Sequence, residues 1–478
     1  MATKENGFLK FVEKNKLILA ICLINICAIL ALITPVFSYI TIGLSLVLIS
    51  VLNYENGLIV TASMLPYSSV LKIFNAEGGY FVILAYYCLL SFIKLLVNKE
   101  LRFDLKICIP AALFLVYCLL PIGPYEKFKW AYIGVYLLLF IGSMVFWRLR
   151  RKINVRKVLH LAILFMVFVY VITPVAKFLP LGKMLPYTQI GERYGALFSN
   201  CNYLGFFCAI SGAMLVSESV VCHGKLKTFF YFLVTLAMGL STLSKAFMLV
   251  ALVEVAILGI YYLVLMHKRT SLRRYFWIVI SVVIVVGCAL VSGIIARFEA
   301  IKNINFDVIL TGRVSIWHEA MEKWTTSAIT IIFGNGLASP ASSFENLAHN
   351  VYIEFLQKTG IIGLTLLLLT ITFSILSVMK NRINDGKLIL FFPLVLCFIY
   401  GLTSTLIVFD PALFCIFMAI AFLDLGDRNK LDLIKINLKS RNKAKKDLNV
   451  QENKLNLQEN EDKSEENGLE NEEKRIIG

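Results

Sequence analysis

The chain has 478 residues, of which 58% are hydrophobic and 16% are charged, and its mean hydropathy is +0.77. This composition excludes a soluble domain built around one buried core. The formal net charge of +16 could suit a nucleic-acid-binding protein, but the Lys and Arg residues gather in short loops between apolar segments. That placement argues against nucleic acid as a partner and predicts a polytopic membrane protein.

The fold class predicted from these segments is all-α and integral to the membrane. Because a spanning helix needs about 20 mostly apolar residues, the sequence predicts about fourteen helices, or twelve if closely joined segments are merged. In chain order, the predicted spans are 17–34, 38–52, 57–74, 79–97, 107–122, 129–147, 159–179, 197–218, 228–243, 246–266, 276–295, 361–379, 388–407 and 411–425.

The basic loops predict the orientation of these spans. If the N-terminus starts inside, every Lys/Arg-rich loop falls on the same side of the membrane: 98–106, 148–157, 267–274 and 381–388. By the positive-inside rule, this side is cytoplasmic. We therefore expect both termini in the cytoplasm of a bacterial cell and the chain in its cytoplasmic (inner) membrane.

Five regions follow from this topology. A cytoplasmic N-terminus (1–16) precedes a transmembrane bundle (17–295). Residues 296–360 form a large extracytoplasmic loop that carries the catalytic motif, and residues 361–425 form the last transmembrane helices. The polar, charged tail (426–478) cannot offset its ordering entropy and is predicted to be disordered. Loops as long as 296–360 are usually functional. Within this loop, residues 313–324 have the apolar face of a helix that lies in the membrane interface.

Four polar features collect on the predicted outer side. They are Arg193 with Asn200 and Asn202, Lys245 in a tight turn, Arg313 in the long loop, and His349 at the end of that loop. Each has a plain structural interpretation, because a cation at a span end can anchor the helix at the headgroups and a histidine can simply pack. Together, three cations in a partly dry site predict an anionic ligand such as diphosphate.

His349 supplies the group that the cations lack, because a neutral imidazole can accept a proton from a hydroxyl near pH 7. The acidic residues of the long loop are scattered, with no pair at metal-ligand spacing. We therefore expect no divalent metal and no other cofactor.

The residues around His349 resemble a family signature. His349-Asn350, nine further residues and then Gly360-Ile-Ile-Gly363 are similar to the end of the large periplasmic loop in the O-antigen ligase and O-antigen polymerase superfamily. The order of GRVSIW (312–317) and FGNGL (333–337) before this motif is also similar.

Two further elements resemble the same superfamily. Arg193-Tyr-Gly-Ala-Leu197 is similar to its Arg-x-x-x-Leu element, and Ser244-Lys245 stands where these proteins commonly have Ser followed by a basic residue. Lys245 stands where arginine is frequent in the superfamily. A lysine keeps the positive charge at this position but cannot form the bidentate hydrogen bonds that an arginine makes with a diphosphate. The resemblance covers residues 190–365.

The resemblance implies a membrane glycosyltransferase that moves a whole glycan from a polyprenyl diphosphate carrier to a hydroxyl of an acceptor glycan or glycolipid. Arg193, Arg313 and Lys245 would then bind the diphosphate and His349 would be the base, with inversion at the anomeric carbon. The expected supporting residues are Asn350, Asn200, Asn202, Gly360 and Gly363. A ligase and a polymerase of surface or capsular polysaccharide both fit.

A transporter or flippase of lipid-linked saccharides is the alternative. It would carry its substrate site near the bilayer midplane, often between internal repeats. Glu254 is the one acid deep in a predicted span, and it is either a functional group or a packed neutral residue. The absence of repeats and the outer position of the cations favour the enzyme. A scaffold or sensor of envelope assembly is supported only by the charged tail.

Overall fold

The computed structural model describes residues 7–74, 76–101, 105–120, 129–176, 178–179, 193–222, 226–266, 313–343, 347–384, 387–402 and 410–425. All of them belong to one unit of the chain, Met1–Leu425. The predicted span 276–295, residues 296–312 of the predicted loop and the predicted tail 426–478 lie outside the described residues.

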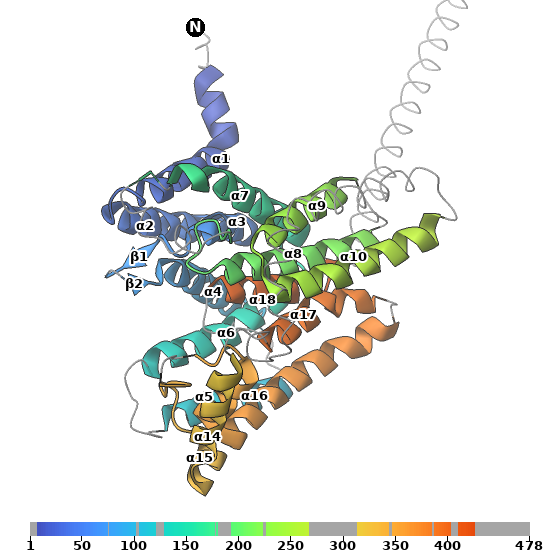
Figure 1. Cartoon of the computed structure of the whole chain (residues 1–478). Coiled ribbons are helices and arrows are strands. Elements are labelled where there is room, and N and C mark those ends of the chain that lie inside the picture. The colour runs from blue at the N-terminus through green and yellow to red at the C-terminus, as the bar shows by residue number, and fades with distance from the viewer. Residues whose placement is uncertain are drawn as a thin grey trace, which may run out of the picture. The chain divides into compact units, whose positions relative to one another are not determined.

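The described residues are almost entirely helical (Figure 1). The N-terminal helices are α1 (Gly7–Leu30), α2 (Val36–Val51), α3 (Tyr54–Met64) and α4 (Gly79–Val97). The middle helices are α5 (Leu105–Leu119), α6 (Lys129–Leu149), α7 (Val155–Ala176), α8 (Cys201–Val221), α9 (Leu226–Ser241) and α10 (Lys245–Met266). The last are α14 (Arg313–Trp324), α15 (Ala328–Phe333), α16 (Val351–Asn384), the 3₁₀ helix η5 (Leu388–Phe391), α17 (Phe392–Gly401) and α18 (Asp410–Phe422).

The predicted span 57–74 is wrong. The helix there, α3, ends at Met64 after 11 residues, too few to cross a bilayer. Pro66 follows in a 3₁₀ turn, η1 (Leu65–Tyr67), because proline has no N–H to continue the helix. The chain then forms an antiparallel hairpin of β1 (Lys72–Ile73) and β2 (Ala76–Glu77).

Five of the described helices are long and apolar enough to cross a membrane: Gly79–Val97, Trp130–Leu149, Val155–Ala176, Cys201–Val221 and Val351–Leu376. Six shorter apolar helices of 10–17 residues accompany them. A helical membrane protein is therefore confirmed, and the total of about fourteen spans stays a prediction.

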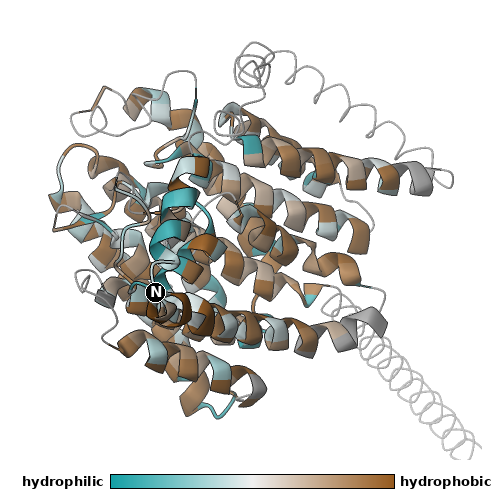
Figure 2. Cartoon of the chain, turned by 60° about the horizontal axis from the view of Figure 1, so that its bottom comes forward, coloured by the Kyte–Doolittle hydropathy of each residue, from teal (hydrophilic) through white to brown (hydrophobic). Residues whose placement is uncertain are grey.

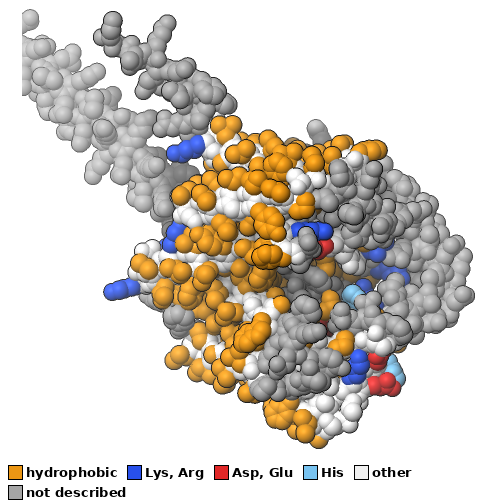
Figure 3. Space-filling model, turned by 90° about the vertical axis from the view of Figure 1, so that its left-hand side faces the viewer, with side chains coloured by type: hydrophobic (Ala, Val, Ile, Leu, Met, Phe, Trp, Pro, Cys, Tyr) orange, Lys and Arg blue, Asp and Glu red, His pale blue; other side chains and the backbone are white. Residues whose placement is uncertain are grey.

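Hydrophobic residues make up most of the length of the described helices (Figure 2). Large apolar side chains are exposed over much of the described surface on the face shown in Figure 3. On α7 they form one stripe at helical spacing: Leu164, Phe168, Val171 and Val175. Exposed apolar surface of this extent is unfavourable in water and is expected where acyl chains are the solvent.

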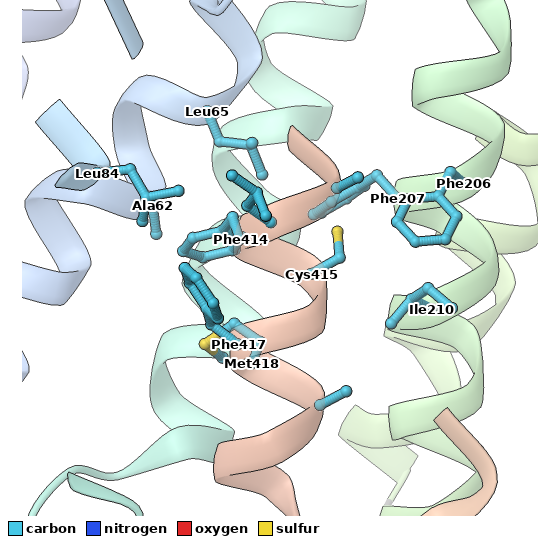
Figure 4. Packing of buried hydrophobic residues seen from close by; sticks show 14 of the residues in the cluster. Ala62, Leu65, Leu84, Phe206, Phe207, Ile210, Phe414, Cys415, Phe417 and Met418 are labelled. Carbon is cyan, nitrogen blue, oxygen red and sulfur yellow. The ribbon is translucent and has the colours of Figure 1, made fainter. Parts of the chain in front are cut away.

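The core is centred on α18, near the end of the unit. Its Phe414, Cys415, Phe417 and Met418 pack between α3 and α4 on one side and α8 on the other (Figure 4). Phe417 stacks on Phe146 of α6 at 5.2 Å between ring centroids. Most residues of α8 are buried, and α9, α10, α17 and α18 pack on it.

Ion pairs gather at one end of the bundle. The loop between α6 and α7 supplies the cations. Arg150 Nε lies 2.5 Å from Asp424 Oδ2, Arg156 Nε lies 2.7 Å from Glu218 Oε1, Lys157 Nζ lies 2.9 Å from Glu55 Oε1, and Lys152 pairs with Glu100. These contacts bring the basic loop 148–157 next to the ends of α4, α8 and α18.

The opposite end carries the short hairpin and the segment before α8. The Ser199 N–H donates to Ser69 Oγ at 2.8 Å, and the Ser199 hydroxyl donates to Glu77 Oε2 at 3.2 Å. Burial raises the pKa of the Glu77 carboxyl, whereas the Ser199 hydrogen bond and the charge of Lys72 lower it. The basic loop and the start of α8 thus lie at opposite ends of the bundle, and which end faces the cytoplasm stays a prediction.

The two ends generate a test of topology. We expect Ser343→Cys, in the predicted outer loop, to react with a membrane-impermeant maleimide in right-side-out vesicles, and we expect Arg151→Cys to react only after permeabilisation. Both parent side chains are exposed, so the labelling depends on the side of the membrane on which each residue lies. The unsubstituted protein gives the background of its own cysteines. Labelling in the reverse order would refute the orientation.

Candidate functional site

Arg193 is fixed against the start of α8. Its Nε–H donates to the carbonyl oxygen of Thr242 at 3.0 Å, and its Nη2 donates to Asn202 Oδ1 at 2.8 Å. Asn200 caps the helix, because its Oδ1 accepts from the Asn202 N–H at 2.9 Å. The structure thus brings together three residues that the sequence singled out, and the two asparagines orient Arg193 and its helix.

The turn between α9 and α10 lies beside them. Leu243 has a left-handed backbone with φ of 48°, Ser244 is buried, and Lys245 begins α10. The Ser244 hydroxyl lies 3.3 Å from the hydroxyl of Tyr400 on α17. A side chain at Gly205 of α8 would meet Ser244, Thr242 and Tyr400 at about this same distance of 3.3 Å, so the glycine lets these groups meet.

Arg313, the first residue of α14, joins the same group. Burial lowers the pKa of its guanidinium, the positive charge of Arg193 lowers it further, and Tyr400 raises it. Arg313 therefore lies within electrostatic reach of both residues, although it stays a cation at neutral pH. The two predicted arginines converge on Tyr400, which sequence reasoning missed because a tyrosine within an apolar span gives no signal.

His349 immediately precedes α16 and is half-buried, with a left-handed φ of 52°. Asn350 caps the helix: its Oδ1 accepts from the N–H groups of Tyr352 at 3.0 Å and Ile353 at 3.2 Å. The Tyr352 hydroxyl donates to the carbonyl oxygen of Phe398, and Val351 and Tyr352 lie against Gly401. The His-Asn turn thus packs on the end of α17, the helix that carries Tyr400.

Gly360 has a structural position. With φ of 62° it kinks α16, and a Cβ there would lie 2.3 Å from the carbonyl oxygen of Ile332. The kink leaves helix carbonyls for other donors. The backbone N–H of Asn335 donates to the carbonyl oxygen of Gln357 at 2.8 Å, and the backbone N–H of Gly336 donates to the carbonyl oxygen of Lys358 at 3.0 Å. FGNGL and the first glycine of GIIG are therefore partners in one backbone contact.

The second glycine of that motif has a separate role. A Cβ at Gly363 would lie 2.3 Å from the Thr359 Cβ and 3.1 Å from the ring of Tyr117. The Tyr117 hydroxyl lies within hydrogen-bonding distance of the Phe333 and Thr359 carbonyl oxygens, at 2.7 and 2.8 Å. Gly363 therefore lets α5 approach the kink. Neither Gly360 nor Gly363 belongs to the group of cations formed by Arg193, Lys245 and Arg313.

The helix α14 covers the residues predicted for it, 313–324, but buries a different face. Ala320 is fully buried against Ala341 and Ala348, with Ile316 and Trp317 beside it. Small alanines permit this close approach. The helix therefore packs on the segment that leads to His349, and Val314, predicted on its apolar face, is exposed.

An apolar cavity of about 820 Å³ lies between α5 and α6 on one side and α16, α17 and α18 on the other. One end is lined by Trp147 and Leu423, near the ion pairs, and the other by Val351, Tyr352 and Gly401. Its volume and its apolar lining suit a long hydrocarbon chain. It reaches Val351 and Tyr352, the residues that follow the His-Asn turn.

Glu254 lies apart from these groups. It is nine residues after Lys245 along α10, or about 13 Å at 1.5 Å per residue. Its carboxylate is buried against Gly212 of α8, where a Cβ would lie 2.5 Å from Oε2. This glycine makes room for the acid between the two helices.

Together, the helices and their exposed apolar surface define a polytopic membrane protein, and Arg193 and Arg313 lie at one end of it. Residues 230–368 match the O-antigen ligase family, which confirms the resemblance found in the motifs. The match includes the turn at Lys245, Arg313 and the His-Asn turn, while Arg193 lies before it. Neither a curated protein nor a solved structure gives a significant match.

The contact at Gly360 generates a prediction on stability. Gly360→Ala places a methyl group against the Ile332 carbonyl at a left-handed φ, so we expect a loss of about 2 kcal/mol or more of unfolding free energy. Thermal unfolding of the purified protein in detergent measures it. The matched control is Gly134→Ala in α6, where a Cβ meets nothing within 4 Å. Equal unfolding temperatures in the two variants would contradict the contact.

Proposed function

We propose that the protein is a membrane glycosyltransferase that transfers a glycan en bloc from a polyprenyl diphosphate carrier to an acceptor hydroxyl, as an O-antigen ligase or a surface polysaccharide polymerase. The observation that carries this proposal is the position of Arg193 on the Thr242–Ser244 turn that contacts Tyr400, with Arg313 within electrostatic reach of both Arg193 and Tyr400 and the turn of His349 packed on the same helix α17. The family match to the O-antigen ligases supports a transferase that uses a lipid-linked donor.

In this proposal Arg193 and Arg313 bind the diphosphate, with Lys245 as a third positive charge. Two nearby cations repel each other, and the electrostatic effect of Arg193 on Arg313 is this repulsion. A bound diphosphate would relieve it and would accept charge-assisted hydrogen bonds from both guanidinium groups. The contacts of Arg193 with Thr242 and Asn202 hold its guanidinium in place before the ligand arrives.

The chemical step needs a base and a stabilised leaving group. The acceptor oxygen attacks the anomeric carbon, the bond from that carbon to the phosphate oxygen breaks, and the hydroxyl proton passes to His349. The diphosphate leaves on its lipid with its negative charge held by the arginines. Direct attack inverts the anomeric carbon, and no covalent intermediate with the protein is needed.

The apolar cavity supports a lipid-linked donor. A diphosphate held by the arginines would place its hydrocarbon chain near Val351, Tyr352 and Gly401, which line one part of the cavity. In a membrane the chain is already out of water, so the cavity would favour it by shape and packing alone.

The arginines generate a prediction on activity. We expect Arg193→Ala and Arg313→Ala each to lower kcat/KM by about two orders of magnitude or more, because two to three kcal/mol of charge stabilisation is lost. Lys substitutions should rescue in part, since an ammonium cannot reproduce the planar fork. Glycan transfer by purified protein from a lipid-linked donor is the measurement. The control is Arg151→Ala, whose parent side chain is exposed at the opposite end of the bundle. Full activity of both Arg193→Ala and Arg313→Ala would show that these arginines take no part in the reaction.

His349 generates the most specific prediction. His349→Gln keeps hydrogen bonding but not basicity near neutral pH, and His349→Asn suits the left-handed backbone; both should lose about 10²- to 10⁴-fold in kcat. The parent rate should fall in acid, because protonated imidazole cannot accept the hydroxyl proton. His318→Gln, on the exposed side of α14, is the control. An active Gln or Asn variant with an unchanged pH profile would show that His349 is structural.

A further inference from the structure

The backbone at His349 is held in a conformation that its own residue does not favour. A left-handed φ is uncommon outside glycine, and such residues persist only where the surrounding structure determines them. Asn350 fixes the chain after His349 by capping α16. The groups that fix the chain before His349 are therefore of interest.

Both backbone groups of Ala348, the preceding residue, have partners from other parts of the fold. Its carbonyl oxygen accepts from Nε1 of Trp317 on α14 at 2.8 Å. Its N–H donates to Oε2 of Glu354, one turn into α16, at 3.3 Å. Ala348 is fully buried, so water does not compete for either bond.

Glu354 is itself held by a buried cation. Its Oε1 accepts from Lys358 Nζ at 2.6 Å, and both side chains are almost completely buried. Lys358 also donates to the Tyr132 hydroxyl at 2.9 Å, and its ammonium lies 4.2 Å from the centre of that ring. A buried ion pair is poor evidence for stability, because desolvation of the two charges offsets their attraction.

We infer that Glu354, oriented by Lys358, is a positioning residue that holds the Ala348–His349 backbone so that the imidazole faces the acceptor. This inference rests on the proposed function, because it assigns Glu354 a role in the reaction only if His349 is the base. Lys358 occupies one carboxylate oxygen, which aims the other at the Ala348 N–H. Trp317 holds the carbonyl side of the same residue, so the turn is clamped from α14 and from α16.

Two double variants separate the hydrogen bond from the ion pair. The exchange of Glu354→Lys with Lys358→Glu keeps opposite charges at 354 and 358 and lets Tyr132 donate to the new carboxylate, but an ammonium at 354 cannot accept the Ala348 N–H. Glu354→Gln with Lys358→Met removes both charges at similar volume and keeps an acceptor oxygen at 354. The exchanged pair should keep the stability of the protein and lose the hydrogen bond to the Ala348 N–H. The neutral pair should keep both the stability and that hydrogen bond.

The matched control lies at the opposite end of the bundle. Glu55 accepts from Lys157 Nζ at 2.9 Å with one oxygen and from the Asn154 N–H at 2.8 Å with the other, which is the same arrangement. The exchange of Glu55→Lys with Lys157→Glu therefore removes an equivalent backbone bond far from His349. We expect it to leave kcat within about twofold of the parent.

Three measurements on the purified full-length variants decide the inference: kcat and KM for a lipid-linked donor, the unfolding temperature, and amide hydrogen exchange of the segment 347–350. For the exchanged pair at 354 and 358, we expect faster exchange in that segment and a fall in kcat of about tenfold or more, since misplacement by about 1 Å can cost a hundredfold. KM and the unfolding temperature should stay near the parent values. The neutral pair should keep most of kcat.

Three outcomes would overturn the inference. Parent-like exchange and kcat in the exchanged pair would show that Glu354 does not hold the turn. Equal losses of kcat and unfolding temperature in both double variants would show a general packing role. Faster exchange with an unchanged kcat would show that Glu354 holds the turn but that catalysis does not depend on it. The His349→Gln variant then decides on the proposed function, because an inactive variant keeps His349 as the base and an active one removes it.

Discussion

The contact between two glycine backbones, at Gly334 and Gly360, is the constraint on which the candidate site depends. A Cβ on Gly334 would lie 2.4 Å from the carbonyl oxygen of Lys358, and a Cβ on Gly360 would lie 2.6 Å from the nitrogen of Gly334. The kink leaves polar backbone groups exposed near the hydrocarbon region, where each unsatisfied group costs several kcal/mol. The loop before α16 supplies their partners, which anchors the loop on the bundle.

This anchoring explains how residues distant in sequence act at one end of the molecule. The loop carries α14 and therefore Arg313, while the first turn of α16 carries the cap of the His-Asn turn. The bundle part supplies Tyr400 from α17 and Arg193 from the segment before α8, where Asn202 holds it. The candidate site is thus assembled from the membrane part and the loop part of the chain. This arrangement suits a reaction between a lipid-borne donor and a soluble or membrane-bound acceptor.

Much of the fold could be predicted from hydropathy, and the failures have clear physical reasons. The predicted span 79–97 coincides with α4, because lipid imposes an apolar length that a sequence displays directly. The segment 57–74 is also mainly apolar but is interrupted at Pro66, and most of its residues are buried by other helices. Hydropathy does not distinguish these two surroundings.

The candidate site was predictable where charge is rare. Arg193, Arg313 and His349 could be singled out because few charges occur on the predicted outer side. Tyr400 could not, since a tyrosine in an apolar run is common and its contact with Ser244 joins residues 156 positions apart. Glu354 could not, since a glutamate in a helix opening is common and its role depends on the backbone of Ala348 turning back to meet its carboxylate. The buried face of α14 was also missed, because it depends on the alanines of a partner segment.

The central position of α18 has a consequence for how the protein is made. This helix is the last described element to leave the ribosome, yet its Phe414 and Phe417 fill the space between the N-terminal helices and α8. Helices inserted earlier must therefore wait, loosely associated in the bilayer, until residues 410–422 arrive. The face of α8 that carries Phe206, Phe207 and Ile210 gains its partner only then, so packing of the two halves of the bundle is coupled to completion of synthesis.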